Sequence, residues 1–219
     1  AAAGDGPDLL AAAYLLPLLV LVAVRMVTGL FVVDFDRFYA LAPIASAAVL
    51  LRVRQRLPRF QWSPIWQAPA VGAAVFMLWW AFEQYASPGA NTSADLRVAV
   101  DGMTSPAKQL WLVGRVVGSV CVVPIVEELA FRGYLLRRII SSDIETVRFD
   151  RFTWTSFLVS SIAFGVLHER WLAGVLAGMA FAGIQYHRGR IADAIVAHAV
   201  ANGLIALAVL WADQWAMWG

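Results

Sequence analysis

Three charged side chains stand close together in an apolar part of this chain. Glu127, Glu128 and Arg132 lie in the stretch VPIVEELAFRGYLLRR, at the end of the apolar run 110–126. A charge near the centre of a bilayer costs about 2.5–3.5 kcal/mol, so ionisable residues in a membrane helix indicate a functional site. Glu128 and Arg132 are one helical turn apart, with the acid first, which favours an ion pair. We therefore expect Arg132 to hold Glu128, leaving Glu127 free to accept a proton or meet a ligand.

Pro124 precedes the two glutamates in the same predicted helix. Proline has no N–H, and its ring crowds the carbonyl group of the residue four positions earlier, here Val120. This predicts a kink just before the glutamates, and a site at a helix defect is easier to hydrate.

Two histidines fall at a similar depth on other predicted helices. His168 ends the stretch SSIAFGVLH, and His198 lies in IVAHAVANGL, one turn before Asn202. At 1.5 Å per residue, Glu127, His168 and His198 lie about 15, 21 and 12 Å from the basic ends of their helices. We expect these three side chains to meet in one cavity, with His198 and Asn202 on one face.

Such a set of side chains is suited to hydrolysis of an amide bond. A carboxylate and a histidine can activate water, while a second histidine and an amide can stabilise an oxyanion. The same groups could instead hold a metal-bound water, because imidazole and carboxylate suit a divalent metal such as zinc. The stretch HERWL does not match the H-E-x-x-H zinc signature, because Leu172 stands in place of the second histidine, and the chain contains no G-x-S-x-G elbow.

Each of these residues also has a purely structural interpretation. Glu128 and Arg132 could form an ion pair that only stabilises the bundle. A histidine in a membrane helix can simply bond to a neighbouring carbonyl group. Asn202 could bridge two helices without touching a substrate.

Composition indicates an integral membrane protein. Of the 219 residues, 61% are hydrophobic and 15% charged, whereas about 25% are charged in typical globular domains. The net charge is only +2, and the basic residues stand between apolar runs, so we expect a lipid bilayer and no nucleic acid as a partner. The single cysteine, Cys121, excludes an internal disulfide. Because the chain does not begin with methionine, we expect it to be either a trimmed chain or a domain of a longer protein.

The apolar pattern predicts an all-α, polytopic transmembrane bundle of about seven to eight helices. The predicted helices cover 9–33, 39–53, 68–82, 109–140, 154–168, 171–186 and 191–211. Residues 60–67 resemble an interfacial connector, and the polar stretch 83–108 is predicted to be an extramembrane loop. We expect one membrane-embedded domain over 1–219, with its motif-bearing core at about 109–211.

Three basic clusters predict the orientation of the bundle. They are the arginines of 52–59, the loop 137–151 and the turn 187–190. A cytoplasmic N-terminus places all three on the cytoplasmic side, as the positive-inside rule favours. We therefore expect a multi-pass protein of a bacterial cytoplasmic membrane with its N-terminus inside.

The ordered motifs resemble the CAAX prenyl protease and bacteriocin-processing family (CPBP, or Abi) of intramembrane proteases. That family carries E-E-x-x-x-R, F-x-x-x-H and H-x-x-x-N or D on three helices. Here these motifs are Glu127-Glu128-L-A-F-Arg132, Phe164-G-V-L-His168 and His198-A-V-A-Asn202.

The resemblance implies a helical membrane peptidase that cleaves a membrane-anchored or prenylated, CAAX-like substrate. By position, it implies that Glu127 and His168 activate water, His198 and Asn202 stabilise the oxyanion, and Arg132 orients Glu128. The family includes proteins described as metalloproteases and as metal-independent glutamate proteases, and we favour water activation by Glu127 and His168 while leaving the metal open.

Two other function classes remain alternatives. The family also contains bacteriocin self-immunity proteins and scaffolding homologues, so a non-catalytic protein could share the fold. Buried acids and histidines also serve transporters and proton relays. Such transporters often contain two matching broken helices, whereas this sequence contains one broken, charged helix.

Overall fold

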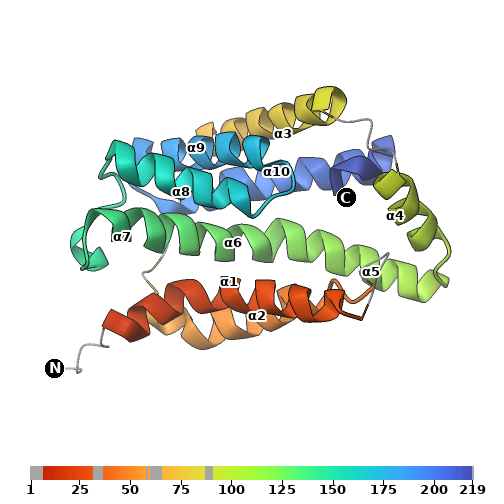
Figure 1. The fold of residues 1–219 in the computed structure, drawn as a ribbon, viewed down its shortest axis with the longest axis horizontal. Helices are drawn as coiled ribbons and strands as arrows, with labels where there is room; N and C mark the ends of the chain where they lie inside the picture. Colours follow the sequence, from red (N-terminus) through yellow and green to blue (C-terminus); the bar gives the residue numbers. More distant parts are fainter. Residues whose placement is uncertain (1–6, 32–36, 58, 60–65, 87–90, 219) are drawn as a thin grey trace.

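The computed structural model describes residues 7–31, 37–57, 59, 66–86 and 91–218. Over this part of the chain the structure is an all-α bundle of eight helices without strands, as predicted (Figure 1). Four helices precede the central one: α1 (Pro7–Gly29), α2 (Leu41–Val53), α3 (Gln67–Ala86) and α4 (Asn91–Asp101). The central helix runs from Ser105 to Ile140 and is followed by α8 (Trp154–Val166), α9 (Trp171–Arg188) and α10 (Ile191–Ala212).

The central helix is continuous but not uniform. Its α-helical parts are α5 (Ser105–Val117), α6 (Val123–Glu128) and α7 (Leu136–Ile140), joined by the π-helical segments η2 (Gly118–Val122) and η3 (Leu129–Leu135). Short 3₁₀ turns form η1 (Arg54–Arg56), η4 (Ile144–Thr146) and η5 (Trp215–Trp218). The defects therefore lie on both sides of the two glutamates in α6.

Among the described residues, three helices are long and apolar enough to cross a membrane: Leu9–Gly29, Ser105–Ile140 and Ile191–Ala212. A span needs about 20 apolar residues, and the apolar helix α8 is shorter. These helices agree with an integral membrane protein.

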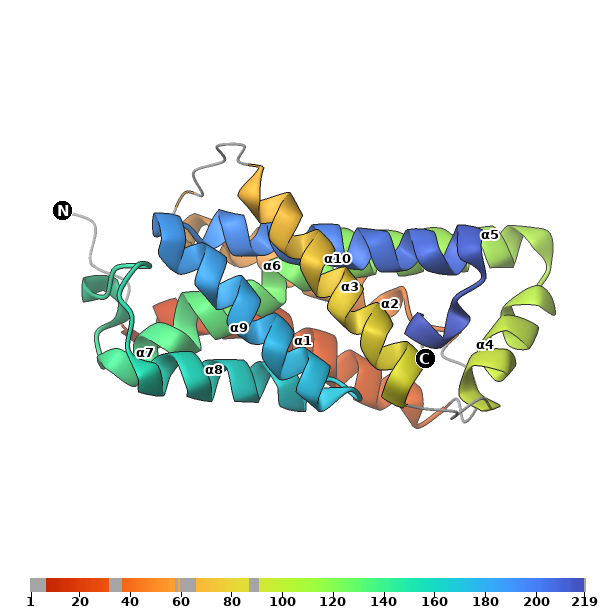
Figure 2. The same ribbon diagram turned by 90° about the horizontal axis from the view of Figure 1, so that it is seen from above.

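The central helix lies between two layers of helices. In Figure 1, α1 and α2 lie on one side of it, while α3, α8, α9 and α10 lie on the other. Figure 2 shows α3 crossing over α9 and α10, and it packs against both of them. The main apolar core joins these layers around Val126, Phe131, Phe164 and Phe181.

Small residues allow the close approach of the helices around the site. A Cβ atom on Gly174 of α9 would lie 2.9 Å from Gly165 Cα on α8. A Cβ atom on Gly178 would lie 3.1 Å from Ser161 Cα. Because helices in membranes associate largely through such close packing, these glycines fix the distance between α8 and α9.

The prediction of a single loop over 83–108 is wrong. Helix α3 continues to Ala86, α4 occupies Asn91–Asp101, and α5 begins at Ser105. Val100 of α4 is fully buried in a cluster with Met217 and Trp218, and Leu96 packs against it. One apolar face is therefore enough to dock this otherwise polar helix on η5. Residues 60–65 of the predicted connector and 32–33 of the predicted first span lie outside the described residues.

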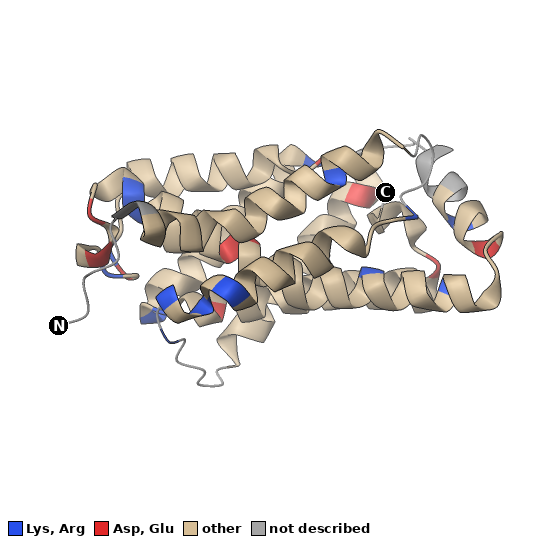
Figure 3. Ribbon diagram, turned by 90° about the horizontal axis from the view of Figure 1, so that it is seen from below, with Lys and Arg blue, Asp and Glu red and all other residues tan. Residues whose placement is uncertain are grey.

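The three basic clusters lie at one end of the bundle. Leu57, Ile144 and Phe149 belong to one apolar cluster, and Gln185 Nε2 donates a hydrogen bond to Phe149 O at 3.1 Å. Figure 3 shows several Lys or Arg positions on the ribbon at the left end, although others lie at the opposite end. The shared end supports the predicted grouping, and the orientation across the membrane stays a prediction.

Candidate active site

The buried ion pair of the central helix has the predicted geometry. Arg132 Nε lies 3.1 Å from Glu128 Oε2, and both side chains are fully buried. Arg132 Nη2 also donates to Gly178 O at 2.8 Å, and the guanidinium lies over the Phe164 ring at 4.3 Å. These extra contacts matter because a buried pair needs further partners to offset the loss of water.

His198 joins this pair to the second glutamate. Its Nδ1 lies 3.0 Å from Glu128 Oε1, and its Nε2 lies 4.0 Å from Glu127 Oε2. An ionised carboxylate can only accept, so Nδ1 carries the hydrogen and Nε2 faces Glu127. The His198 ring also stacks on Phe181, with centroids 4.7 Å apart. The sequence did not predict the Glu128–His198 contact, because helix depth alone does not fix the rotation of a helix.

His168 lies just beyond the end of α8, which stops at Val166 rather than at the predicted residue 168. His168 Nδ1 is 2.9 Å from Phe164 O. A carbonyl oxygen only accepts, so Nδ1 donates and Nε2 remains as the basic nitrogen. The ring is held by Phe164, at 4.7 Å between centroids, and by Trp79, at 5.8 Å.

Asn202 reaches from α10 to the central helix. Its Nδ2 donates to Ser119 O in η2 at 2.8 Å. The structure thus contains the helix bridge that was one of the two interpretations of this residue, and it places the amide in the cavity wall.

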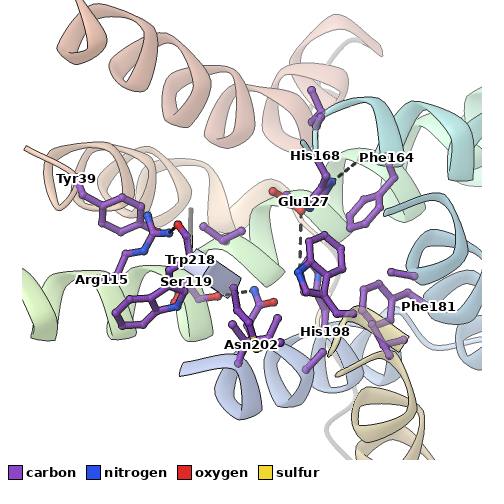
Figure 4. A pocket seen from close by; sticks show the side chains of 18 of the residues that line it. Tyr39, Arg115, Ser119, Glu127, Phe164, His168, Phe181, His198, Asn202 and Trp218 are labelled. Atoms are coloured by element: carbon purple, nitrogen blue, oxygen red, sulfur yellow. Dashed lines mark hydrogen bonds and ion pairs between the residues drawn. The ribbon is translucent and has the colours of Figure 1, made fainter. Parts of the chain in front are cut away.

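The four predicted catalytic side chains line one cavity of about 190 Å³ (Figure 4). They are Glu127, His168, His198 and Asn202. Aromatic side chains form much of the remaining wall: Tyr39, Trp79, Phe164, Phe181 and Trp218. The structure therefore brings together polar groups from three separate parts of the chain in an apolar setting.

The comparison with known families agrees with this arrangement. Residues 109–204 match the family model of the Rce1-like type II CAAX prenyl endopeptidases. The predicted family resemblance is confirmed over this segment. The chain has no match among curated proteins or among solved structures.

The Rce1-like segment contains all six predicted site residues and runs from α5 into α10. It covers less than half of the chain, and α1 to α4 lie outside it. At the family level, the match supports a CAAX-type intramembrane protease.

The pairing within the site differs from the one implied by the family motifs. Those motifs associate Glu127 with His168, whereas Glu127 here lies 4.0 Å from His198. Among the described residues no hydrogen bond or ion pair joins Glu127 to His168, although both line the cavity. Water between the two side chains would be needed to couple them.

Two arginines in the cavity wall were not predicted as site residues. Arg115 donates to Trp218 O at 2.7 Å and lies over the Tyr39 ring at 4.3 Å. Arg25 lies over the same ring at 6.0 Å. The sequence carried a signal for both, because each is the single arginine of an apolar run, 9–33 for Arg25 and 110–126 for Arg115, and such residues tend to face a site.

The donor types around the cavity are those that zinc accepts, namely imidazole nitrogen and carboxylate oxygen. Within the described part of the chain, however, no three His, Cys, Asp or Glu residues are grouped closely enough to hold a metal ion. The observed geometry does not fit a metal centre.

Proposed function

We propose that this protein is an intramembrane endopeptidase that hydrolyses a peptide bond in a membrane-anchored or prenylated, CAAX-like protein or peptide. The observation that carries the proposal is the cavity of the Rce1-like segment, where a carboxylate and two histidines converge. Its volume of about 190 Å³ is ample for a water molecule, which needs roughly 10–15 Å³.

In the proposed reaction, Glu127 and His168 activate the attacking water. The Glu127 carboxylate accepts one proton of the water, while His168 Nε2 accepts a hydrogen bond from its other O–H. The water oxygen bonds to the substrate carbonyl carbon, and an oxyanion forms. When the C–N bond breaks, the proton passes to the departing amine. Each substrate thus consumes one water and yields one carboxylate and one protonated amine.

His198 and Asn202 are proposed to stabilise the oxyanion. His198 can donate from Nε2 only as an imidazolium, because its Nδ1–H is directed at Glu128. Glu128 fixes the orientation of the His198 ring through this contact, and Arg132 in turn holds Glu128 at 3.1 Å. Asn202 supplies an amide N–H. Donors held in place before the reaction are effective because they need no reorganisation.

Cleavage of membrane-anchored and prenylated peptides by the detergent-solubilised protein tests the proposal. Glu127→Gln is expected to lower the cleavage rate at least about 100-fold, since general bases contribute about 10²–10⁴. The control is Glu145→Gln, because Glu145 is an exposed acid in η4, and its activity should equal that of wild type. Cleavage that persists in Glu127→Gln would contradict the proposal.

Cleavage in the presence of a strong chelator distinguishes a glutamate protease from a metalloprotease. Retained wild-type cleavage in chelator, together with loss in Glu127→Gln, supports a glutamate protease, whereas loss in chelator supports a metalloprotease. Unchanged biological activity in the Glu127 and His198 variants would favour the immunity or scaffolding alternative. Proton flux into liposomes that requires Glu127 would favour the transporter alternative.

A further inference from the structure

The carbonyl group of Ser119 lacks a helical hydrogen-bond donor because of Pro124. In η2, a carbonyl oxygen accepts from the N–H five residues ahead, as Gly118 O does from Val123 N–H. By the same spacing, the donor for Ser119 O would be residue 124, a proline without an N–H. The donor that an α-helix would offer, Val123 N–H, is already directed at Gly118 O.

Asn202 provides the missing donor from another helix. Its side-chain amide meets Ser119 O at 2.8 Å (Figure 4). Because a carbonyl oxygen only accepts, the nitrogen of the amide must face it, and the orientation of the amide is fixed. An amide carries two N–H hydrogens, so one remains for a group in the cavity that Asn202 lines.

We propose that Pro124 and Ser119 are positioning residues for Asn202. Because Pro124 has no main-chain N–H, Ser119 O accepts from the Asn202 amide instead. That hydrogen bond orients the amide that donates to the oxyanion. The inference rests on the proposed function, in which Asn202 is an oxyanion donor. The π-helical segment before Pro124 thereby acquires a specific chemical role, since a donor fixed by a second contact is preorganised.

Pro124→Ala tests the inference directly. The new N–H can bond to Ser119 O if the π register persists. If the segment becomes α-helical, Val123 N–H takes that role. In either register Ser119 O gains a main-chain donor and Asn202 is released. Alanine is more favourable than proline within a helix, so the variant is expected to fold. Pro17→Ala is the matched control, because Pro17 lies inside α1.

The orientation of the amide can be measured without any activity. The chain has two asparagines, Asn91 and Asn202, so protein labelled with ¹⁵N-asparagine gives two pairs of side-chain amide signals, and Asn91→Gln assigns them. We expect Pro124→Ala to move the bonded Asn202 proton upfield and to speed its exchange with water, whereas Pro17→Ala leaves it unchanged. An unaltered Asn202 signal in Pro124→Ala would overturn the inference.

Kinetics test the link to catalysis. Removal of an oxyanion donor costs about 10²–10³ in kcat, and we expect Pro124→Ala to lose about tenfold or more of kcat with little change in KM. In the Asn202→Ala background, Pro124→Ala should cause no further loss, because both act through one group. Wild-type kcat in Pro124→Ala, or fully additive losses, would overturn the positioning role.

The amide signal and the kinetics together distinguish a failure of this inference from a failure of the proposed function. If wild type cleaves but Asn202→Ala does so equally well, the oxyanion role of Asn202 fails. The inference then fails with it, even if the amide signal moves. If wild type cleaves no substrate, the proposed function fails, and the amide signal alone decides whether Pro124 and Ser119 orient Asn202.

Discussion

Glu128 contacts two other ionisable side chains of the site. One of its oxygens faces Arg132 and the other faces His198. Its side chain is fully buried, so neither contact is screened by water to any great extent. Glu128 therefore links an ion pair that stabilises the bundle to a histidine that lines the cavity.

This double role predicts that stability and activity respond differently to substitution at the pair. Glu128→Gln leaves the Arg132 charge buried without its partner, which should cost about 3–5 kcal/mol in the free energy of unfolding. Adding Arg132→Gln removes the unpaired charge and should recover much of that loss. Cleavage should stay low in both variants, because His198 lacks its anionic partner. Denaturant unfolding in detergent and the peptide assay measure the two quantities.

Recovery of activity together with stability in the double variant would contradict the assigned role of Glu128. Arg138→Gln is a suitable control, because Arg138 is exposed and lies at the basic end of the bundle. That variant should change neither quantity.

At the residue scale, the sequence predicted the Glu128–Arg132 pair because both residues lie on one helix, where spacing determines contact. It did not predict how His198 is shared between the two glutamates. That contact depends on the rotation of α10 relative to α6, and apolar membrane helices carry little periodic polarity from which rotation could be inferred. The hydrogen bond from Asn202 to Ser119 was missed for the same reason.

At the scale of the elements, α9 positions the site through its glycines. Gly178 is buried against α8, and its carbonyl oxygen accepts from Arg132. A Cβ atom there would meet Ser161 Cα at 3.1 Å and Arg132 Nη2 at 3.3 Å. Gly183 lies on the same helix, but a Cβ atom there has nothing within 4 Å.

The two glycines form a matched pair for substitution. Gly178→Ala should destabilise the protein by about 1–3 kcal/mol, because backbone and guanidinium must shift to admit the methyl group. Gly183→Ala should be neutral or should stabilise by up to about 1 kcal/mol, since alanine is the better helix former. Thermal unfolding of the two variants in one detergent measures the difference. Equal stabilities would show that the α8–α9 interface tolerates an added methyl group at Gly178.

The elements were predicted with uneven success, for physical reasons. Long apolar runs predicted α1, the central helix and α10, because a span must be continuously apolar. Helix α4 was missed, since its residues are largely polar and it is stabilised by Val100 docking on distant η5. The sequence also did not predict the π-helical form of η2, although Pro124 indicated where the helix would be irregular.

At the scale of the whole molecule, the bundle has two chemically different ends. The three basic clusters lie together where α7 ends, and Figure 1 shows α4 at the opposite end. There Arg97 pairs with Asp213, and Lys108 pairs with Asp101 at 2.6 Å. Basic residues at the second end are thus paired with acidic ones, as Arg148 is with Asp150 at the first end. The orientation across the membrane stays a prediction that rests on the three basic clusters.

Single cysteines can test this orientation, because the chain contains only Cys121. In a Cys121→Ala background, Glu145→Cys places a thiol in η4 at the basic end, and Gly102→Cys places one between α4 and α5. Both positions are exposed. In inverted vesicles, a membrane-impermeant maleimide should label Glu145→Cys and spare Gly102→Cys, and right-side-out vesicles should give the opposite result. The reverse pattern would place the basic end outside, whereas labelling of both from one side would contradict their separation by the membrane.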